Sequence, residues 1–333
     1  MVITITEALN FKDAVFIDTR TPKEYEEDHL PGAINLPILS NEERAIVGTL
    51  FKQVSKEKAI KQGMQFFSPK LPHFLEEITK YKDKRIIIYC WRGGMRSKTV
   101  VSLFSALGYD VEQLQGGYKS YRLHVRERLS RYVLKPKIIV LWGLTCTGKT
   151  ELLSKFSDFL DLEGLAQHRS SLYGSIGLTP RSQKSFENLL LQSLDQLNDK
   201  KQILIEGESR KIGDVEMPPF LWKAMNNGLA IQVTRSLEKR AQACVKEYFS
   251  SSDHVQKIRE TTVGLWKVIS KKRKQEVLDL IDNKQYKEAA AILLSEYYDP
   301  LYGHTLKKKD FAFTLDNDDV DRAEEILTRK LSL

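Results

Sequence analysis

The stretch KIIVLWGLTCTGKT, residues 137–150, decides the fold of the second half of the chain. Its apolar run KIIVLW is typical of a buried strand, and the pattern G-x4-G-K-S/T follows directly in Gly143 to Thr150. The next stretch, ELLSKFSDFL at 151–160, has a helical pattern. A strand, a glycine-rich turn and a helix in this order predict a phosphate-binding loop in a parallel sheet.

The chemistry of such a P-loop follows from its parts. Its backbone N–H groups surround a diphosphate, Lys149 neutralises the terminal oxygens, and Thr150 can hold Mg²⁺. ATP hydrolysis does not follow, because the next predicted strand ends in Glu206 where a metal-positioning Asp is usual, and Glu206 or Glu208 would have to replace it. The diphosphate therefore need not belong to a nucleotide. The residues predicted to bind it are Gly143, Thr145, Cys146, Thr147, Gly148, Lys149 and Thr150, with Cys146 also interpreted as a packing residue.

Further strands and helices extend this second domain. Apolar runs at 202–206 and 230–234 predict strands with helices between them, as in a parallel sheet. Residues 236–298 have a helical pattern throughout, and the chain closes with a strand-like run at 310–315 and a helix capped by Asp319. We therefore predict a P-loop NTPase-like domain with a helical C-terminal region over residues 136–333.

The first half of the chain predicts a smaller α/β domain. Strand and helix patterns alternate, with the strands at 14–18, 86–90 and 111–114 and the helices at 21–28 and 96–107. A basic helix over Tyr118–Lys135 follows and ends before Pro136, since the residue before a proline disfavours the helical conformation. We place this domain, with its connecting helix, at residues 1–135. A chain of 333 residues has room for two such cores.

Cys90 ends one of these strands and begins a second anion-binding turn. It is followed by Trp91-Arg92-Gly93-Gly94-Met95-Arg96-Ser97, after which a helical pattern begins. The N–H groups of such a turn can converge above the helix N-terminus, where they stabilise a thiolate and bind an oxyanion. Arg92 and Arg96 add positive charge and can bind a phosphate group in bidentate fashion. A buried structural cysteine needs neither these glycines nor these arginines, so we predict that Cys90, Arg92 and Arg96 are catalytic.

The residues around this turn resemble those of rhodanese domains. The matching stretches, within residues 1 to about 125, are FIDTR (16–20), EY (24–25), HLPGAIN (29–35) and QGGY (115–118). The resemblance implies a cysteine that carries sulfur, or a relative of sulfur, as a persulfide. The loop from Cys90 to Arg96 is one residue longer than in sulfur-carrying rhodaneses and has the length found in related phosphatases, so phosphatase chemistry stays an alternative. Asp18 and Arg20 either belong to the site or fix the loop from beneath.

The order of the two domains and several motifs resemble tRNA 2-selenouridine synthases. The motifs are CWRGGMRS (90–97), GLAQHR (164–169), SQKSFE (182–187), EGESRKIG (206–213) and YYDPLY (297–302). The likeness covers nearly the whole chain, with Ser170-Ser171 standing where a Gly-Ser pair is expected.

This family resemblance implies a two-step exchange at the wobble uridine of certain tRNAs. Geranyl diphosphate alkylates the sulfur of 2-thiouridine, and selenium from selenophosphate then replaces the S-geranyl group to give 2-selenouridine. The P-loop would bind the departing diphosphate, while Cys90 would take selenium as a perselenide and deliver it to C2 of the base. The implied partners are tRNA, geranyl diphosphate, selenophosphate and a selenophosphate synthase as donor, with Mg²⁺ as an optional cofactor.

Other residues are candidates for substrate and RNA contacts. Those predicted to touch phosphate or base are His168, Arg169, Glu206, Glu208 and Arg210. Those predicted to meet tRNA phosphates are Lys119, Arg122, Arg126, Arg235, Lys239, Arg240, Lys271, Lys272 and Arg273. Trp266 or Tyr248 could stack on a splayed base. Structural bracing or core packing is the competing interpretation for each of these residues.

Composition and charge agree with this interpretation without deciding it. With 41% hydrophobic and 29% charged residues, the chain has the composition of a folded globular protein. A net charge of +8 favours contact with polyanions such as nucleic acid. The three cysteines argue against a disulfide framework, and no cluster of side chains indicates a metal centre. The start MVITITEALNFKD lacks a signal sequence and no run is long enough to span a membrane, so we expect a cytoplasmic protein.

Three alternatives stay open from the sequence. The chain could be a P-loop kinase or ATPase with an accessory rhodanese module, a phosphatase that uses Cys90 and Arg96, or a tRNA-binding scaffold without catalysis. They require different behaviour: nucleotide turnover without RNA, phosphate release through Cys90, or RNA binding that survives replacement of both Cys90 and Lys149.

Overall fold

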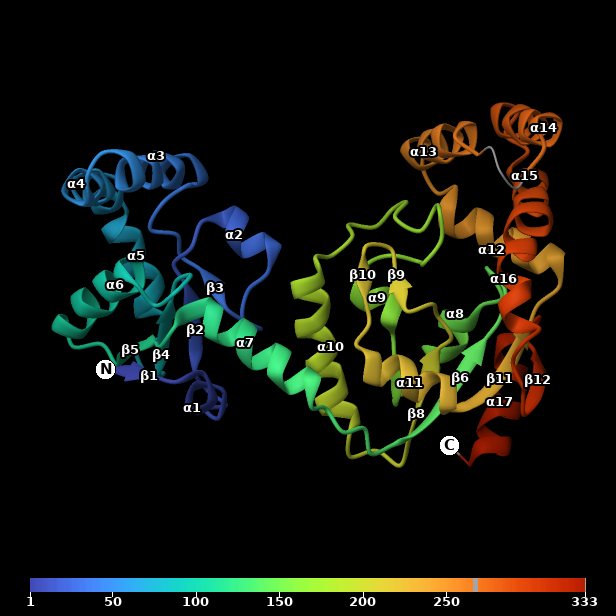
Figure 1. Cartoon of the computed structure of the whole chain (residues 1–333), viewed down its shortest axis with the longest axis horizontal. Coiled ribbons are helices and arrows are strands. Elements are labelled where there is room, and N and C mark those ends of the chain that lie inside the picture. Colours follow the sequence, from blue (N-terminus) through green and yellow to red (C-terminus); the bar gives the residue numbers. More distant parts are fainter. Residues whose placement is uncertain (266–268, 333) are drawn as a thin grey trace. The chain divides into compact units, whose positions relative to one another are not determined.

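The computed structural model describes residues 1–265 and 269–332, and the chain divides into two compact units, Met1–Arg131 and Tyr132–Leu333. Each unit is built on its own five-stranded parallel sheet (Figure 1). The predicted α/β class with two parallel-sheet domains is therefore confirmed. The division falls close to the predicted boundary at residue 135.

The first unit has the strand order β1-β5-β4-β2-β3. Ile86 and Ile88 of the central strand face a core that includes Phe74 and Phe104, because alternate side chains of a strand share one face. Its strands are β1 (Val2–Ile3), β2 (Val15–Asp18), β3 (Ile34–Asn35), β4 (Ile86–Tyr89) and β5 (Val111–Leu114). Its helices are α1 (Ile5–Leu9), α2 (Pro22–Glu27), α3 (Asn41–Gln53), α4 (Lys56–Phe67), α5 (Leu71–Thr79), α6 (Met95–Ala106) and α7 (Gly117–Ser130), with a short 3-10 turn at Ser68–Lys70.

The second unit has the strand order β12-β11-β6-β8-β7. Its strands are β6 (Lys137–Trp142), β7 (Phe159–Leu160), β8 (Gln202–Glu206), β11 (Leu229–Thr234) and β12 (Phe313–Asp316), and a separate antiparallel hairpin joins β9 (Lys211–Ile212) to β10 (Val215–Glu216). The chain runs from β6 to β7 and β8 on one side and then to β11 and β12 on the other. The direction of winding thus reverses at β6, the place where open α/β sheets bind ligands.

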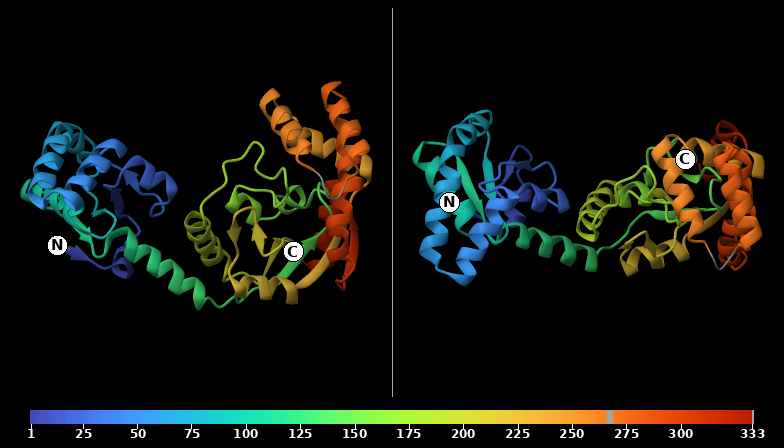
Figure 2. Two further views of the ribbon diagram at one scale, coloured as in Figure 1. Left: turned by 45° about the horizontal axis from the view of Figure 1, so that its top comes forward. Right: turned by 90° about the horizontal axis from the view of Figure 1, so that it is seen from above.

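Two groups of helices accompany this second sheet. Those that lie around the sheet are α8 (Lys149–Leu153), α9 (Leu162–Ala166), α10 (Gln183–Leu197), α11 (Pro219–Asn227) and α17 (Val320–Leu331). The others form a helical group with its own core, which confirms the helical pattern predicted over 236–298 (Figure 2). They are α12 (Leu237–Tyr248), α13 (Ser252–Val263), α14 (Lys271–Asp282), α15 (Tyr286–Ile292), a π-helical segment at Leu293–Tyr298 and α16 (Asp299–Leu306). Among the described residues, no helix is both long enough and apolar enough to cross a membrane.

Two predicted helices are shorter in the structure. The helix after the P-loop ends at Leu153, and Phe159 and Leu160 form β7 beside β8, where Leu160 is fully buried. The connecting helix α7 ends at Ser130 because the next residues bond to the second unit instead. Asn198 accepts a hydrogen bond from the N–H of Lys135 at 3.1 Å and donates one to the carbonyl of Val133 at 3.2 Å.

Candidate functional site

The Cys90 turn lies at the carboxyl end of β4, the central strand of the first sheet. Cys90 is only 3% exposed, and two donors converge on its sulfur. The N–H of Gly94 lies 3.2 Å from Cys90 Sγ, and the hydroxyl of Ser97 lies 3.3 Å from it. Hydrogen bonds of this kind stabilise sulfur in its thiolate form, which is the nucleophilic form.

The backbone of this turn is packed too closely for larger residues. Gly117 has φ +57°, and a Cβ there would lie 2.2 Å from the Cys90 carbonyl. Gly93 has φ +63°, and its Cβ would lie 2.8 Å from a carbonyl of β5. Gln113 on β5 donates to the carbonyl of Gly93 at 2.8 Å and to Ser97 Oγ at 2.9 Å. Gln113 was not predicted from the sequence, because no local pattern joins it to the cysteine.

The two arginines of the turn have different surroundings. Arg92 is exposed, while Arg96 is largely buried and its Nη1 donates to Glu24 Oε2 at 2.9 Å. Burial alone would raise the pKa of Glu24, but the hydrogen bond and charge of Arg96 outweigh it and hold that pKa below its ordinary value. Glu24 therefore stays ionised and holds Arg96 beside the turn.

Asp18 and Arg20 form a buried pair beneath the turn. They are 0% and 1% exposed, and Arg20 Nη2 donates to Asp18 at 2.6 Å and to the Asp28 carbonyl at 2.7 Å. The guanidinium also lies over the Tyr118 ring at 3.9 Å, and the N–H of Tyr118 donates to the Cys90 carbonyl at 2.8 Å. Of the two readings of this pair, the structure supports the one in which it fixes the loop from beneath.

The P-loop lies at the carboxyl end of β6, on the floor of a cavity of about 970 Å³. Lys149 Nζ folds back over its own loop, 3.3 Å from the Gly143 carbonyl and 3.7 Å from Glu206 Oε1. Burial would lower the pKa of Lys149, but the charges of Glu206 and Glu208 outweigh it and raise that pKa. The ammonium group of Lys149 is therefore charged and can bind an anion.

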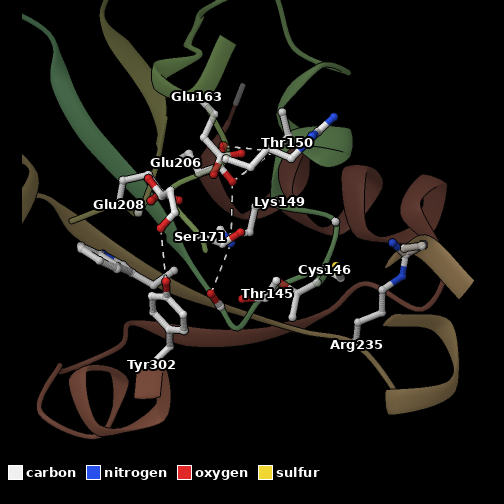
Figure 3. A pocket seen from close by; sticks show the side chains of 18 of the residues that line it. Thr145, Cys146, Lys149, Thr150, Glu163, Ser171, Glu206, Glu208, Arg235 and Tyr302 are labelled. Atoms are coloured by element: carbon white, nitrogen blue, oxygen red, sulfur yellow. Dashed lines mark hydrogen bonds and ion pairs between the residues drawn. The ribbon is translucent and has the colours of Figure 1, made fainter. Parts of the chain in front are cut away.

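Three carboxylates gather beside this lysine, as Figure 3 shows. Single oxygens of Glu163, Glu206 and Glu208 lie within 4.8 Å of one another, and Thr150 Oγ1 donates to Glu206 at 3.1 Å. Burial raises the pKa of Glu206 to about 7 and also raises the pKa of Glu163 and Glu208. Buried oxygens in such proximity suit a hard cation such as Mg²⁺. The expectation that no side-chain cluster could hold a metal was wrong, because Glu163 joins the other two acids only through the fold.

Side chains distant in sequence brace the P-loop. Arg240, which is 4% exposed, donates from Nε to the Thr145 carbonyl at 2.9 Å and pairs with both carboxylate oxygens of Asp299. Asn317 donates to the Thr147 carbonyl at 2.8 Å. Cys146 between them has φ 61°, an uncommon conformation for a residue with a side chain. The prediction that Arg240 contacts tRNA is wrong, because its guanidinium is buried in this support.

The remaining substrate candidates separate into two sets. Arg169 and Arg210 line the P-loop cavity together with Glu206 and Glu208. The ring of His168 is instead enclosed by glycines, since a Cβ at Gly174 or Gly213 would lie within 2.7 Å or 2.6 Å of it. Burial also lowers the pKa of His168. His168 is not among the described residues that line the P-loop cavity, and its contact with substrate stays a prediction.

The basic residues predicted to meet tRNA are also divided. Lys119, Arg126, Lys239, Lys271 and Lys272 are exposed, and Arg122 is half-buried. Arg235 lines the P-loop cavity, where it bonds to Glu151 at 3.1 Å. Arg273 pairs with Glu276 at 2.6 Å and with Glu296, which neutralises the charge predicted for RNA. Tyr248 is a core residue at 6% exposure, and Trp266 lies outside the described residues.

Comparisons with known proteins agree for both halves of the chain. The family model of the tRNA 2-selenouridine synthase AAA domain matches residues 136–332, and that of the rhodanese-like domain matches residues 4–124. The tRNA 2-selenouridine synthase of Nitrosomonas europaea is 33% identical, and that of Pseudomonas syringae pv. syringae is 30% identical, each with 91% of both chains covered. A crystal structure of the N-terminal domain of a putative ATP/GTP binding protein from Clostridium difficile is 45% identical, covers 38% of this chain and 98% of that one, and gives a TM-score of 0.37.

Proposed function

This chain belongs to the tRNA 2-selenouridine synthase family, and from that premise we propose that it exchanges sulfur for selenium in wobble 2-thiouridine by way of an S-geranyl intermediate. Geranyl diphosphate supplies the alkyl group and selenophosphate supplies the selenium. One observation carries the proposal: the chain has two separate anion-binding turns, one with a buried sulfur and the other with a buried lysine. Alkylation releases diphosphate and the selenium step uses a phosphate-bearing donor, so each turn would serve one of the two steps.

The P-loop serves the alkylation step. The sulfur of 2-thiouridine attacks the first carbon of the geranyl chain, the carbon–oxygen bond breaks, and diphosphate leaves. The N–H groups of the loop and Lys149 stabilise the charge that develops on the leaving diphosphate. Thr150 with Glu163, Glu206 and Glu208 would hold Mg²⁺, which would add positive charge at the same oxygens when bound.

The P-loop cavity also offers room for a hydrocarbon chain. Trp142 directly precedes the P-loop, and Trp222, Leu301 and Leu306 line the same cavity. Leu301 is 45% exposed, so apolar surface is left uncovered beside the phosphate cradle. A ligand with a diphosphate at one end and a geranyl chain at the other would bury that surface and gain free energy from it.

The Cys90 turn serves the selenium step. Cys90 with Arg92 and Arg96 handles the phosphate-bearing selenium donor, and selenium then displaces geranylthiol from C2 of the base. The exposed cations Lys119, Arg126, Lys239, Lys271 and Lys272 are proposed contacts for tRNA phosphates. A selenophosphate synthase is the proposed source of the donor.

Reconstitution with a 2-thiouridine RNA tests this function. The full chain is incubated with geranyl diphosphate alone, with selenophosphate alone and with both, and the nucleosides are weighed by mass spectrometry. We expect S-geranyl-2-thiouridine with the first, unchanged RNA with the second, and 2-selenouridine with both. Unchanged RNA in all three mixtures, or 2-selenouridine without geranyl diphosphate, would contradict the proposal.

A further inference from the structure

Gln113 fixes the backbone of the Cys90 turn, in which the N–H of Gly94 points to the sulfur. Gln113 Nε2 donates to the carbonyls of Gly93 at 2.8 Å and Gly94 at 3.3 Å. In a trans peptide the C=O and N–H bonds point in opposite directions, so the bond from Gln113 to the Gly93 carbonyl turns the N–H of Gly94 to the other side. The N–H of Gly94 accordingly lies 3.2 Å from Cys90 Sγ, while the Gly94 carbonyl oxygen lies 4.0 Å from Cys90 Sγ. The N–H of Gly94 can therefore donate to an oxygen of a phosphate placed beside the sulfur.

Glu24 positions the arginine that closes this turn. Its Oε2 accepts from Arg96 Nη1 at 2.9 Å and from the N–H of Thr21 at 3.1 Å, so the carboxylate is itself anchored at the start of α2. Arg96 is held by one nitrogen, which leaves the rest of the guanidinium to bind two oxygens of a phosphate. Five residues separate Cys90 from Arg96, the loop length of enzymes in which a cysteine attacks phosphorus.

Ser97 completes the arrangement from within the protein. Its hydroxyl lies 3.3 Å from two acceptors, Cys90 Sγ and the Gly94 carbonyl oxygen, receives a hydrogen bond from Gln113 at 2.9 Å and is 0% exposed. A fixed hydroxyl donor stabilises negative charge on sulfur, both when the thiolate attacks and when it leaves.

We propose that Cys90 attacks the phosphorus of the selenium donor, and not its selenium, so that the enzyme passes through a phosphocysteine; the identity of the donor rests on the proposed function. The Sγ–P bond forms, the Se–P bond breaks, and hydrogen selenide leaves with the electron pair of that bond. The selenide attacks C2 of the S-geranyl base and expels geranylthiol. Water then cleaves the Sγ–P bond, phosphate departs, and Ser97 stabilises the returning thiolate.

Electron balance favours attack at phosphorus over transfer of selenium to sulfur. Selenium in selenophosphate is already at the selenide level that the product requires. Its transfer to Cys90 as a perselenide would leave phosphorus as phosphite, and a thiol reductant would later have to cleave the sulfur–selenium bond. Attack at phosphorus needs neither an oxidant nor a reductant and yields ordinary phosphate.

The experiment is an acid quench of the full chain with selenophosphate, followed by intact-protein mass spectrometry and phosphorus NMR of the solution. We expect a phosphoryl adduct on Cys90 that lacks the isotope envelope of selenium, and phosphate as the released product. Ser97→Ala should increase the trapped adduct by about tenfold, because hydrolysis then expels an unassisted thiolate. Ser105→Ala, on the exposed face of α6, should match the parent protein.

Several outcomes would overturn the phosphocysteine. They are a selenium isotope envelope on Cys90, phosphite as the product, or 2-selenouridine formation with no phosphoryl adduct in either the parent or Ser97→Ala. These outcomes are distinct from failure of the proposed function. If a phosphocysteine forms but S-geranyl RNA is never converted to 2-selenouridine, the inference stands and the proposed function fails.

Discussion

The Cys90 turn and the P-loop differ in what contacts their functional atom. Two neutral donors, the N–H of Gly94 and the hydroxyl of Ser97, contact the sulfur of Cys90, while the charged pairs Asp18–Arg20 and Glu24–Arg96 lie around the turn. The P-loop is supported by charged groups, and its Lys149 already pairs with Glu206. The contacts to the sulfur of Cys90 are neutral, whereas Lys149 must exchange Glu206 for an incoming anion. Changes in the first should therefore alter chemistry, and changes in the second should alter affinity, stability and pH dependence.

The largest effect should come from Cys90→Ser. We expect selenium incorporation into S-geranyl RNA to fall by roughly a thousandfold, because a hydroxyl is a far weaker nucleophile than a thiolate. Geranylation of 2-thiouridine RNA should stay within about twofold, because the proposed function assigns that step to the P-loop. Nucleoside mass spectrometry of each step measures both, with Cys244→Ala as the control at a buried cysteine outside the turn. Equal loss of both steps in Cys90→Ser would break the comparison.

Lys149→Ala should give the next largest effect, in the opposite step. Loss of its charge beside the diphosphate should weaken geranyl diphosphate binding and slow geranylation by roughly a hundredfold. Conversion of RNA that already carries the S-geranyl group should be unchanged. Lys155→Ala is the matched control, since that lysine bonds to Asp321 on the surface and lies outside the cavity. Slow conversion of pre-geranylated RNA by Lys149→Ala would show that the turns share a step.

Arg240→Met removes a side chain that is distant in sequence and supports the P-loop, without altering the Cys90 turn. It leaves Asp299 and the Thr145 carbonyl without their partner, so we expect a loss of about 2 kcal/mol in the free energy of unfolding. Pyrophosphate should bind about tenfold more weakly, because the loop backbone loses its brace. Chemical denaturation and calorimetry measure these effects. Arg259→Met, which breaks the exposed pair with Asp282, should cost less than about 0.5 kcal/mol.

The smallest predicted effect is a pH dependence that arises from Glu206. Burial raises its pKa to about 7 from 4.5, so the folded ligand-free protein holds a proton that the unfolded chain releases. This contribution to stability is fully present below the pKa that Glu206 has in the unfolded chain. It is lost as the pH rises through the pKa that Glu206 has in the folded protein. Between about pH 5 and about pH 8, the unfolding free energy of the parent protein should fall by roughly 2 kcal/mol more than that of Glu206→Gln.

Denaturation titrations in the presence of a chelator measure this slope. Glu216→Gln is the control, because Glu216 is exposed on β10. A parent protein whose stability does not fall over this range would contradict the buried proton. Added Mg²⁺ should flatten the slope of the parent protein, since a bound cation favours the ionised carboxylates.

Residues close together in sequence were the ones that the sequence could predict. Cys90 to Ser97 and Gly143 to Thr150 each form one turn, and a turn is specified by its own glycines and the strand and helix beside it. Glu163, Gln113 and Asn317 were missed because their partners lie far away in the chain. Arg240 and Arg273 were predicted to face RNA, because a charged residue in the sequence does not show whether the fold places a carboxylate beside it.

The sequence by itself determined the two sheets, their order and the two turns, because strand periodicity and glycine spacing act over a few residues. Only the tertiary structure decided which charged groups pair with one another inside the protein. Three acids meet at Lys149, Glu24 binds Arg96, and Asp299 binds Arg240 across many intervening residues. Burial makes each of these pairings strong and specific, because a desolvated charge must find a partner wherever the fold provides one.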